Sequence, residues 1–546
     1  MIGRIARLAL VLGILIHGQA ALAQQEQGAL SRADLVARVA EGLTAEPGQP
    51  IAAGGVLYRS DPAARIIADL PGWRPVLPAT PEHFGARGDG SDDTDALAAA
   101  FSTGSVRLTS GRTYGFRRLD VPPDTVVSNP GAELRYIGKP KDKVILHVGR
   151  GAHWDTLIYR AAIETRRQSP SILIEGGASI GVLDIAADTQ LDANAVQVVG
   201  DGVEIGLMRS RNFGRPLLVM DPDGGIDGFR LGWHEFESIV RGIRLFDVSN
   251  FEIGGGRQWG RSPLSPNEAP GRNNLLLSGV RHGTFGPLDL GDAAEHAIRF
   301  GGGGDGQGLA SEDVTFAPLT IRRQSASAIK LNPGVEGRVR DIHFADVTII
   351  DPFWQSGENA KASHLIRISH SDRISIAGGS VRHEAPDPVT TEPGVVFAIA
   401  DSTQVDVGPF VVACCARELV AFVEDNDSRR AGYLGDIRDI TFDGIDDAQS
   451  RPLSRAPIRF KTCNIKVKDI LIDGLDLRDL ENQKLVKLPE CDVDMDEIRV
   501  RGQIDGVSRE TFAGMPEDID IEADLTMPGG HRMKGSPRVL RDALSD

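Results

Sequence analysis

In its second half the chain reads Val339-Arg-Asp-Ile-His-Phe-Ala-Asp-Val-Thr-Ile349, and variants of this segment recur at 437–445 and 467–475. Each variant alternates apolar and polar residues with a period of two and carries Asp or Gly near its turns. That alternation is typical of a β-strand with one buried face. Repetition of the same unit along the chain indicates a stack of coils, each built of short strands.

The central apolar residues of these segments recur at a regular interval of 28 to 35 residues. They are Val314, Ile342, Ile374, Val405, Ile440, Ile470 and Ile498, and weaker anchors upstream are Val203, Phe229, Phe251 and Leu276. A propeller needs a unit of roughly 40 to 50 residues, and a leucine-rich repeat shows a leucine and asparagine ladder. Neither pattern is visible. We therefore expect an all-β, single-stranded right-handed parallel β-helix with an N-terminal capping helix and with the anchors stacked in a buried ladder.

The composition limits the kind of protein this can be and the kind of molecule that it can bind. The 546 residues include 60 Lys+Arg and 76 Asp+Glu, a formal net charge of -16 at pH 7. A hydrophobic fraction of 41% with 25% charged residues is ordinary for a folded protein and argues against disorder and against an integral membrane protein. The acidic balance argues against nucleic acid, because a phosphate backbone needs a basic face.

The first residues have the three-part pattern of a cleavable secretory signal. Arg4 and Arg7 precede the apolar run 8–16, and a small-residue site ends at Ala23. We expect cleavage near Ala23, a periplasmic or extracellular protein and no membrane span. The expected division is a signal peptide over 1–23, an N-terminal capping region over 24–80, the β-helix over 81–509, and a C-terminal cap or flexible tail over 510–546.

Four cysteines lie in the last quarter of the chain: Cys414, Cys415, Cys463 and Cys491. Export would expose them to an oxidising compartment, where one or two disulfides would fit, and burial inside stacked strands is the alternative. Their spacing is not that of a zinc site, and we expect neither a metal nor a cofactor.

The segment from Glu82 to Ala100 reads Glu-His-Phe-Gly-Ala-Arg-Gly-Asp-Gly-Ser-Asp-Asp-Thr-Asp-Ala-Leu-Ala-Ala-Ala. Its glycines permit tight turns, its aspartates can cap a helix, and a helix over 94–101 is predicted to cover the open end of the coils. A further amphipathic helix is predicted over 34–43. The segment resembles the entry segment of the pectate lyase-like superfamily, which includes rhamnogalacturonases and polygalacturonases. Because members carry this segment whatever their substrate, the resemblance implies the fold and not the reaction.

Three segments of the middle coils resemble the catalytic coils of polygalacturonases. They are Gly225-Ile-Asp-Gly228, Glu295-His-Ala-Ile-Arg-Phe-Gly301 and Ser327-Ala-Ile-Lys330. The resemblance implies catalytic roles for Asp227, His296 and Lys330. The chain departs from the family where Ala328 replaces an Arg and where 255–259 lacks a pair of aspartates.

That departure leaves the reaction open. Glycoside hydrolysis needs two carboxyl groups, so Asp227 would need a partner from Glu235, Asp292, Glu295 or Asp305. Asp292 and Glu295 are nearest to His296 in sequence. A lyase needs instead a base and a cation that neutralises a uronate carboxylate, for which Arg, Lys and His suffice.

Candidate substrate-binding residues come from the expected register. Six residues after the upstream anchors come Arg209, Glu235, Arg257 and His282, which are predicted to stack as one outward column, either as a binding surface or as a surface charge ladder. Trp233 and Trp259 are predicted either to form a sugar platform or to pack in the core. Arg299 lies beside His296, and a guanidinium group can bind a carboxylate through two hydrogen bonds.

Together these features predict an exported polysaccharide-active enzyme. The favoured reaction is glycoside hydrolysis of the polygalacturonase or rhamnogalacturonase type on an acidic, uronate-containing polysaccharide. A polysaccharide lyase and a non-catalytic carbohydrate-binding or envelope-assembly protein are the alternatives.

Overall fold

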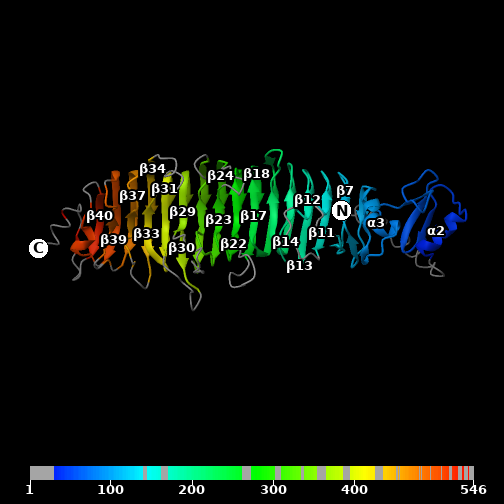
Figure 1. The fold of residues 1–546 in the computed structure, drawn as a ribbon, viewed down its shortest axis with the longest axis horizontal. Helices are drawn as coiled ribbons and strands as arrows, with labels where there is room; N and C mark the ends of the chain where they lie inside the picture. The colour runs from blue at the N-terminus through cyan, green and yellow to red at the C-terminus, as the bar shows by residue number, and fades with distance from the viewer. Residues whose placement is uncertain are drawn as a thin grey trace, which may run out of the picture.

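The computed structural model describes residues 30–526, apart from 139–143, 162–169, 261–271, 302–308, 334–336, 353–363, 385–393, 425–433, 450–452, 454, 479, 481–482, 492, 506 and 516–518, together with 532, 533 and 539. The predicted signal peptide and Asp305 lie outside these residues. Figure 1 shows an elongated stack of strands that runs from the N-terminal to the C-terminal end without doubling back. The strands of the stack pair in parallel with those of the next coil, so the fold is the predicted right-handed parallel β-helix.

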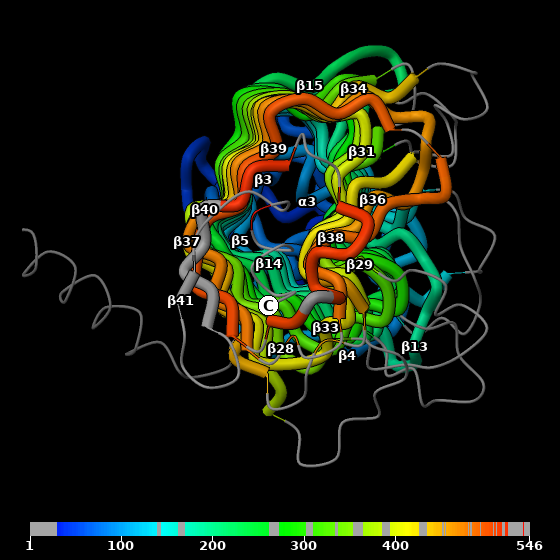
Figure 2. The backbone as a smooth tube through the Cα atoms, turned by 90° about the vertical axis from the view of Figure 1, so that its left-hand side faces the viewer, coloured from blue at the N-terminus to red at the C-terminus, as the bar shows by residue number. Residues whose placement is uncertain are grey.

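One coil consists of three strands, and equivalent strands of successive coils form three long sheets. Figure 2 shows the coils viewed down the long axis of the stack. The first sheet contains β17 (Arg241–Phe246), β20 (Asn273–Ser278), β23 (His296–Phe300), β26 (Ile329–Leu331), β33 (Ala416–Phe422), β36 (Ile458–Phe460) and β38 (Val486–Lys487). The second contains β15 (Ile226–Asp227), β18 (Val248–Ile253), β21 (Arg281–Phe285), β24 (Ser311–Phe316), β27 (Val339–Phe344) and β34 (Gly435–Asp443). The third contains β19 (Gly256–Gly260), β22 (Leu288–Gly291), β25 (Leu319–Arg322), β28 (Val347–Ile350), β30 (Gly379–Arg382), β32 (Phe410–Val412) and β35 (Ile445–Asp447).

Some strands turn a corner and contribute to two sheets. They are β29 (His364–Ile376) and β31 (Gly394–Val407), which join the first and second sheets, β16 (Arg230–Ile239), which pairs with both β18 and β19, and β37 (Ile465–Leu477) and β39 (Asp494–Asp505). The coils nearer the N-terminus contain β4 (Asp89–Asp92), β5 (Ser105–Arg107), β6 (Thr113–Phe116), β7 (Leu119–Val121), β8 (Val126–Ser128), β9 (Glu133–Tyr136), β10 (Leu146–Val148), β11 (His153–Ala161), β12 (Ile172–Ile174), β13 (Ser179–Val198) and β14 (Glu204–Val219).

The predicted anchors form one ladder. Val314 pairs with Ile342, and the pairing continues without a shift through Ile374, Val405, Ile440, Ile470 and Ile498. All are buried in one continuous core. Phenylalanines two residues further along reinforce it, because the rings of Phe285, Phe316 and Phe344 stack with centroids 4.5 and 4.7 Å apart.

One predicted anchor is wrong. Phe251 pairs with Gly283, not with Leu276, and Gly283 in turn pairs with Val314. Leu276 lies on the first sheet, opposite Arg244 and Arg299. A methyl group at Gly283 would overlap the ring of Phe251, so this coil has a glycine where the others have a branched side chain.

The corner that precedes each anchor repeats a left-handed residue. Nine of the described corner residues have φ between 51° and 55°: Asn250, His282, Asp313, Asp341, Arg373, Gln404, Asp439, Asp469 and Glu497. Asn and Asp tolerate this conformation better than other side chains, and this accounts for the frequent Asp just before the anchor in the repeated segments.

The N-terminal end of the β-helix is covered as predicted. Helix α3 (Thr94–Phe101) buries Leu97, Ala100 and Phe101. The ring of Phe101 packs against that of Trp154 of β11, with the ring centroids 5.7 Å apart. Beyond it lies a small antiparallel sheet of β1 (Pro50–Ala53), β2 (Val56–Ser60) and β3 (Trp73–Pro75), followed by the short helix η1 (Pro81–Phe84). Helix α2 (Arg32–Ala40) begins two residues before the predicted 34–43, because Ser31 and Asp34 form a capping box.

At the C-terminal end, parallel pairing continues beyond residue 509. Strand β40 (Ile519–Thr526) pairs in parallel with β39, after the short helix η2 (Arg509–Phe512), and β41 (Arg532–Met533) then pairs antiparallel with β40. The four cysteines form two disulfides, Cys414–Cys415 and Cys463–Cys491. No described helix has the length and apolar character needed to cross a membrane.

Candidate functional site

The predicted site residues lie on all three sheets. The first sheet or its leading edge holds Glu295, His296, Arg299 and Lys330. The second sheet holds Asp227 and His282. The third sheet or its ends hold Trp233, Glu235, Arg257, Trp259 and Asp292. The first sheet therefore brings together four of them, and the other seven lie elsewhere.

Cationic side chains form an in-register column on the first sheet. Arg299 of β23 pairs with Lys330 of β26, and Lys330 pairs with Arg367 of β29. Their neighbours Ile298, Ile329 and Ile366 point into the core, so the three cations face outward, and all three are half-buried. Successive cations are thus separated by one strand spacing, about 4.8 Å.

His296 lies at the start of the same sheet and is buried. Burial lowers the pKa of His296 well below its usual value, and the charges of Lys330 and Arg299 lower it further. The backbone N–H of Ser327 donates to His296 Nδ1 at 3.3 Å. The neutral imidazole therefore carries its proton on Nε2 and acts there as a hydrogen-bond donor.

Glu295 is the carboxylate closest in sequence to this column. Its side chain is 41% exposed, accepts a hydrogen bond from Asn273 Nδ2 at 3.2 Å, and lies 3.8 Å from Arg272 Nε. Ala328, at the position where the resembling family has Arg, is buried beside Lys330. The cationic column therefore consists of Arg299, Lys330 and Arg367, without an arginine at position 328.

Asp227 does not share this face. It lies on β15 in the second sheet and accepts hydrogen bonds from Ser249 Oγ at 3.2 Å and Asn250 Nδ2 at 2.5 Å. Pairing leads from Asp227 through Ser249 and Arg281 to Glu312, three coils further along. Glu312 lies in the strand that follows His296, so three strand spacings separate Asp227 from the coil of His296.

Asp292 lies at the end of the third sheet and is held by an arginine. Both of its carboxylate oxygens accept hydrogen bonds from Arg323, at 2.7 and 2.9 Å, and its side chain is 14% exposed. The same guanidinium lies 5.3 Å from the ring of Trp259. Trp259 also overlies Gly291, where a Cβ would overlap its ring, so its ring packs against backbone and guanidinium.

The predicted outward column on the third sheet is correct for three of its four members. Arg209 pairs with Glu235, and Glu235 pairs with Arg257. The next residue is Asp289, not His282. The prediction of His282 is wrong because it was counted from Leu276; His282 occupies a left-handed corner and its Nδ1 lies 2.8 Å from Asp313 Oδ2.

Trp233 is an exposed aromatic side chain beside this column. It is 39% exposed, and its indole N–H donates to Glu235 Oε1 at 3.4 Å. Gly255 in the next coil leaves room for its ring, since a Cβ there would lie 3.1 Å from Trp233 Cζ3. Trp233 and Trp259 therefore belong to the third sheet and do not flank the cationic column of the first.

Further along the first sheet is a charged cluster that the sequence reading missed. The side chain of Glu418 on β33 is fully buried and lies 2.8 Å from both Arg459 Nη1 and Lys461 Nζ and 3.4 Å from Arg455 Nη1. Burial alone would raise the pKa of Glu418, but Lys461 and Arg459 outweigh burial and lower it. His364 lies two coils before Glu418 in the same register, through Val395. Burial, with Arg367 and Lys461, lowers the pKa of His364 to about 3.

A sequence signal for this sheet was present. Four segments repeat an isoleucine followed by a cation and an apolar residue: Ala297-Ile-Arg-Phe300, Ala328-Ile-Lys-Leu331, Leu365-Ile-Arg-Ile368 and Pro457-Ile-Arg-Phe460. Each Ile points inward and each cation outward. An alignment of these four segments would have predicted that the four cations share one face of the first sheet.

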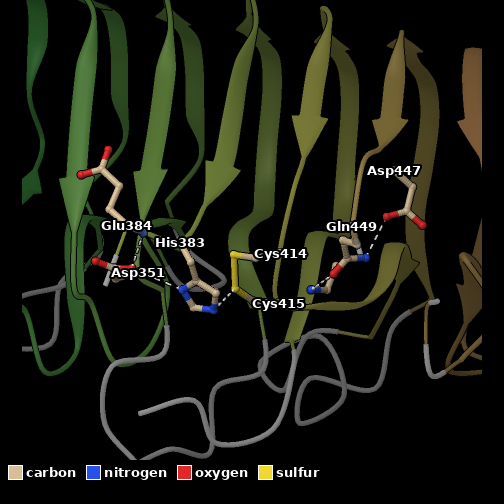
Figure 3. The surroundings of a disulfide bond; sticks show 8 residues. Asp351, His383, Glu384, Cys414, Cys415, Asp447 and Gln449 are labelled. Atoms are coloured by element: carbon tan, nitrogen blue, oxygen red, sulfur yellow. Dashed lines mark hydrogen bonds and ion pairs between the residues drawn. A yellow bond between two sulfur atoms is a disulfide. The ribbon is translucent and has the colours of Figure 1, made fainter. Parts of the chain in front are cut away.

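The disulfide Cys414–Cys415 joins adjacent residues at the end of the third sheet, as Figure 3 shows. His383 Nε2 lies 3.1 Å from Cys415 Sγ, and His383 Nδ1 lies 3.3 Å from Asp351 Oδ1. One imidazole and two sulfur atoms thus lie within 4.8 Å of one another. With the two sulfurs joined, the group offers no thiolate to a metal ion.

No protein-family model and no curated protein matches the chain. Similar solved structures include the N-terminal fragment of bacteriophage phi29 gene product 12, which is 12% identical with a TM-score of 0.41, and the match covers 82% of this chain and 79% of that one. Another is the enzymatically active domain of tailspike protein 2 from bacteriophage CBA120, at 13% identity and a TM-score of 0.33, covering 90% and 66% of the two chains. An exopolygalacturonase from Thermotoga maritima is 10% identical with a TM-score of 0.21, covering 84% and 94%. At these identities and TM-scores the resemblance assigns no function to this chain.

Proposed function

We propose that the protein binds an acidic polysaccharide along the outer face of the first sheet, and that it does so after export with cleavage near Ala23. The observation that carries this proposal is the in-register column of Arg299, Lys330 and Arg367. A linear polymer with repeated carboxylates presents repeated negative charges, and three cations at one strand spacing match such an array.

The chemistry of the column favours carboxylates. Guanidinium groups form two parallel hydrogen bonds with a carboxylate, and a lysine adds a point charge. The neutral His296 beside them supplies an N–H donor and no further positive charge. Binding in this way needs neither a metal nor a cofactor.

Polymer binding tests the proposal. A panel of uronate and neutral polysaccharides is titrated against the full chain, with Arg299→Ala and Arg367→Ala as variants and Arg340→Ala as the matched control. Arg340 is an exposed arginine on β27 of the second sheet, away from the column. We expect the first two variants to lose affinity about tenfold or more for uronate polymers, in a salt-dependent way, and the control to bind normally. Equal loss in the control, or no preference for uronate over neutral polymers, would contradict the proposal.

A second candidate function is cleavage of the bound polymer by β-elimination. This reaction needs one base to remove the proton alpha to the uronate carboxylate, and cations to stabilise the charge that develops. Glu295, exposed and adjacent to His296, supports the role of base. Hydrolysis needs two carboxylates, whereas Asp292 is bound by Arg323 on both oxygens and Asp227 lies on another sheet. We therefore place elimination ahead of the hydrolysis that the sequence favoured.

Product analysis separates the reactions. Elimination gives unsaturated products that absorb ultraviolet light, and Glu295→Gln is expected to abolish that absorbance while polymer binding persists. His296→Ala is expected to abolish the absorbance and also to weaken polymer binding, because it removes a donor of the binding face. New reducing ends without absorbance would support a hydrolase, in which case Asp227→Asn and Asp292→Asn become the decisive variants. Binding with neither product would support the non-catalytic alternative.

A further inference from the structure

A pocket opens at the C-terminal end of the first sheet, beside the Glu418 cluster. Its volume is about 780 Å³, and its lining includes Arg455, Arg459, Lys484 and Lys487. One carboxylate, Glu490, also lines it. Four cations against one carboxylate form a basic pocket in a chain whose net charge is -16.

Glu418 holds the arginines of this pocket in place. Arg455 and Arg459 each direct Nη1 at its buried carboxylate, and Lys461 contacts the other oxygen. A single negative charge therefore lies among three cations, and two of these, Arg455 and Arg459, also line the pocket. Because both guanidinium groups contact Glu418 through Nη1 only, their other N–H donors can bind a ligand.

Two lysines add charge that no described carboxylate neutralises. Lys484 and Lys487 are exposed, and neither forms an ion pair within the part of the chain that the structure describes. Lys487 pairs in register with Arg459, one strand spacing away. The pocket thus presents donors on two neighbouring strands, which suits a group with several oxyanion atoms.

This pocket is separate from the column of Arg299, Lys330 and Arg367, although it lies in the same register. Pairing leads from Arg367 through Ala398 and Ala421 to Arg459, a separation of about 14 Å in three strand spacings. Ala398 and Ala421 belong to a buried apolar cluster with Val395, so the outer face is not continuously cationic.

We propose that the pocket binds the oxyanion group of an acidic oligosaccharide, a uronate carboxylate or a sugar sulfate, as a binding site distinct from the column. The sugar is inferred from the proposed function, whereas the preference for an oxyanion rests on the pocket alone. The pocket would hold one charged sugar while the column follows the polymer.

Calorimetric titration of the full chain with trigalacturonate, with a sulfated disaccharide and with inorganic phosphate tests the assignment. The key variant is Lys484→Ala/Lys487→Ala, which leaves Glu418 and its arginines intact. Lys468→Ala is the control, since Lys468 lies on the second-sheet part of β37, 3.4 Å from Asp496. Thermal melting of each variant confirms that the fold is retained.

We expect one of the two sugars to bind, the double variant to bind it at least tenfold more weakly, and the control to be unchanged. The sugar that binds identifies carboxylate or sulfate as the preferred group. Unchanged binding by the double variant, or binding of inorganic phosphate alone, would overturn the assignment, as would no binding at all.

The two proposals fail separately. If the polymer binds through Arg299 while the double variant behaves as the parent, the pocket assignment falls and the proposed function stands. If no polymer binds but a short sugar does and depends on Lys484 and Lys487, the pocket stands and the proposed function falls.

Discussion

Arg299 of β23 lies directly opposite Lys330 of β26 on neighbouring parallel strands, so two cationic side chains face the same way one strand spacing apart. Like charges in directly opposed positions are destabilising, and the Nε of Arg299 is buried without a hydrogen-bond partner among the described residues. An anion bound between the two cations would reduce the repulsion between them.

This relationship predicts a separation of stability from binding in Arg299→Gln. We expect the free energy of unfolding to change by less than about 1 kcal/mol, because one like-charge contact is relieved as one packed side chain shortens. Affinity for a uronate polymer should fall about tenfold, equivalent to about 1.4 kcal/mol. Denaturant unfolding and polymer titration give the two quantities, and a large loss of stability with intact binding would contradict the prediction.

The anchor ladder predicts that Ile440→Asp does not fold. Ile440 is fully buried between Val405 and Ile470, and an aspartate there would place an unpaired charge in the core. A cost above about 4 kcal/mol is expected, enough to prevent accumulation of folded protein. Normal expression and normal melting of this variant would show that the register is wrong.

Gly283, which occupies the anchor position of its coil, should not tolerate a larger side chain. At Gly283 even Ala is too large, because its methyl group would overlap the ring of Phe251. We expect Gly283→Ala to destabilise the protein by about 1–3 kcal/mol, because the ring of Phe251 would have to move to make room for the methyl group. Gly283→Ala combined with Phe251→Leu should recover part of the loss, and a double variant no more stable than the single would contradict this account.

Buried neutral histidines predict lower stability in acid. Burial lowers the pKa of His234, which is fully buried on β16, to about 3. The unfolded chain binds its proton near pH 6.5, so this group favours folding above that pH and loses its contribution as the pH falls. The loss at pH 5 is about 2 kcal/mol. Unfolding free energies at pH 7.5 and pH 5 should differ less in His234→Gln than in the parent, and equal differences would show that His234 does not titrate in this way.

The two disulfides should differ in their effect on stability. Cys463–Cys491 closes a loop with a sequence separation of 28, whereas Cys414–Cys415 joins neighbours. On the chain-entropy account, removing the first costs about 3–4 kcal/mol and removing the second about 1 kcal/mol. Paired Cys→Ser variants compared by thermal melting test this order, and a larger loss at 414–415 would indicate a structural role for that bond beyond loop closure.

Local sequence was sufficient for much of the fold. Alternation and a repeat of 28 to 35 residues predicted the coil and the ladder from Val314 to Ile498, and the capping aspartates of 82–100 predicted the helix over 94–101 that covers its end. These features are readable because each coil repeats the same inward positions. One coil departs from the repeat, because its anchor position is Gly283. A glycine gives no apolar signal in the sequence, even though the ring of Phe251 fills the space that its side chain would occupy, and the apolar pattern therefore predicted Leu276 as the anchor.

Which residues share a face was decided only by the tertiary structure. Asp227 and His296 lie in segments that both resemble the motifs of one family, yet they lie on different sheets, because pairing between coils determines which sheet a strand joins. Glu418 and Arg459 lie 41 residues apart and meet because their strands pair in neighbouring coils. In a β-helix the identity of a strand follows from the local pattern, but the length of each connecting loop sets which side chains are brought into register.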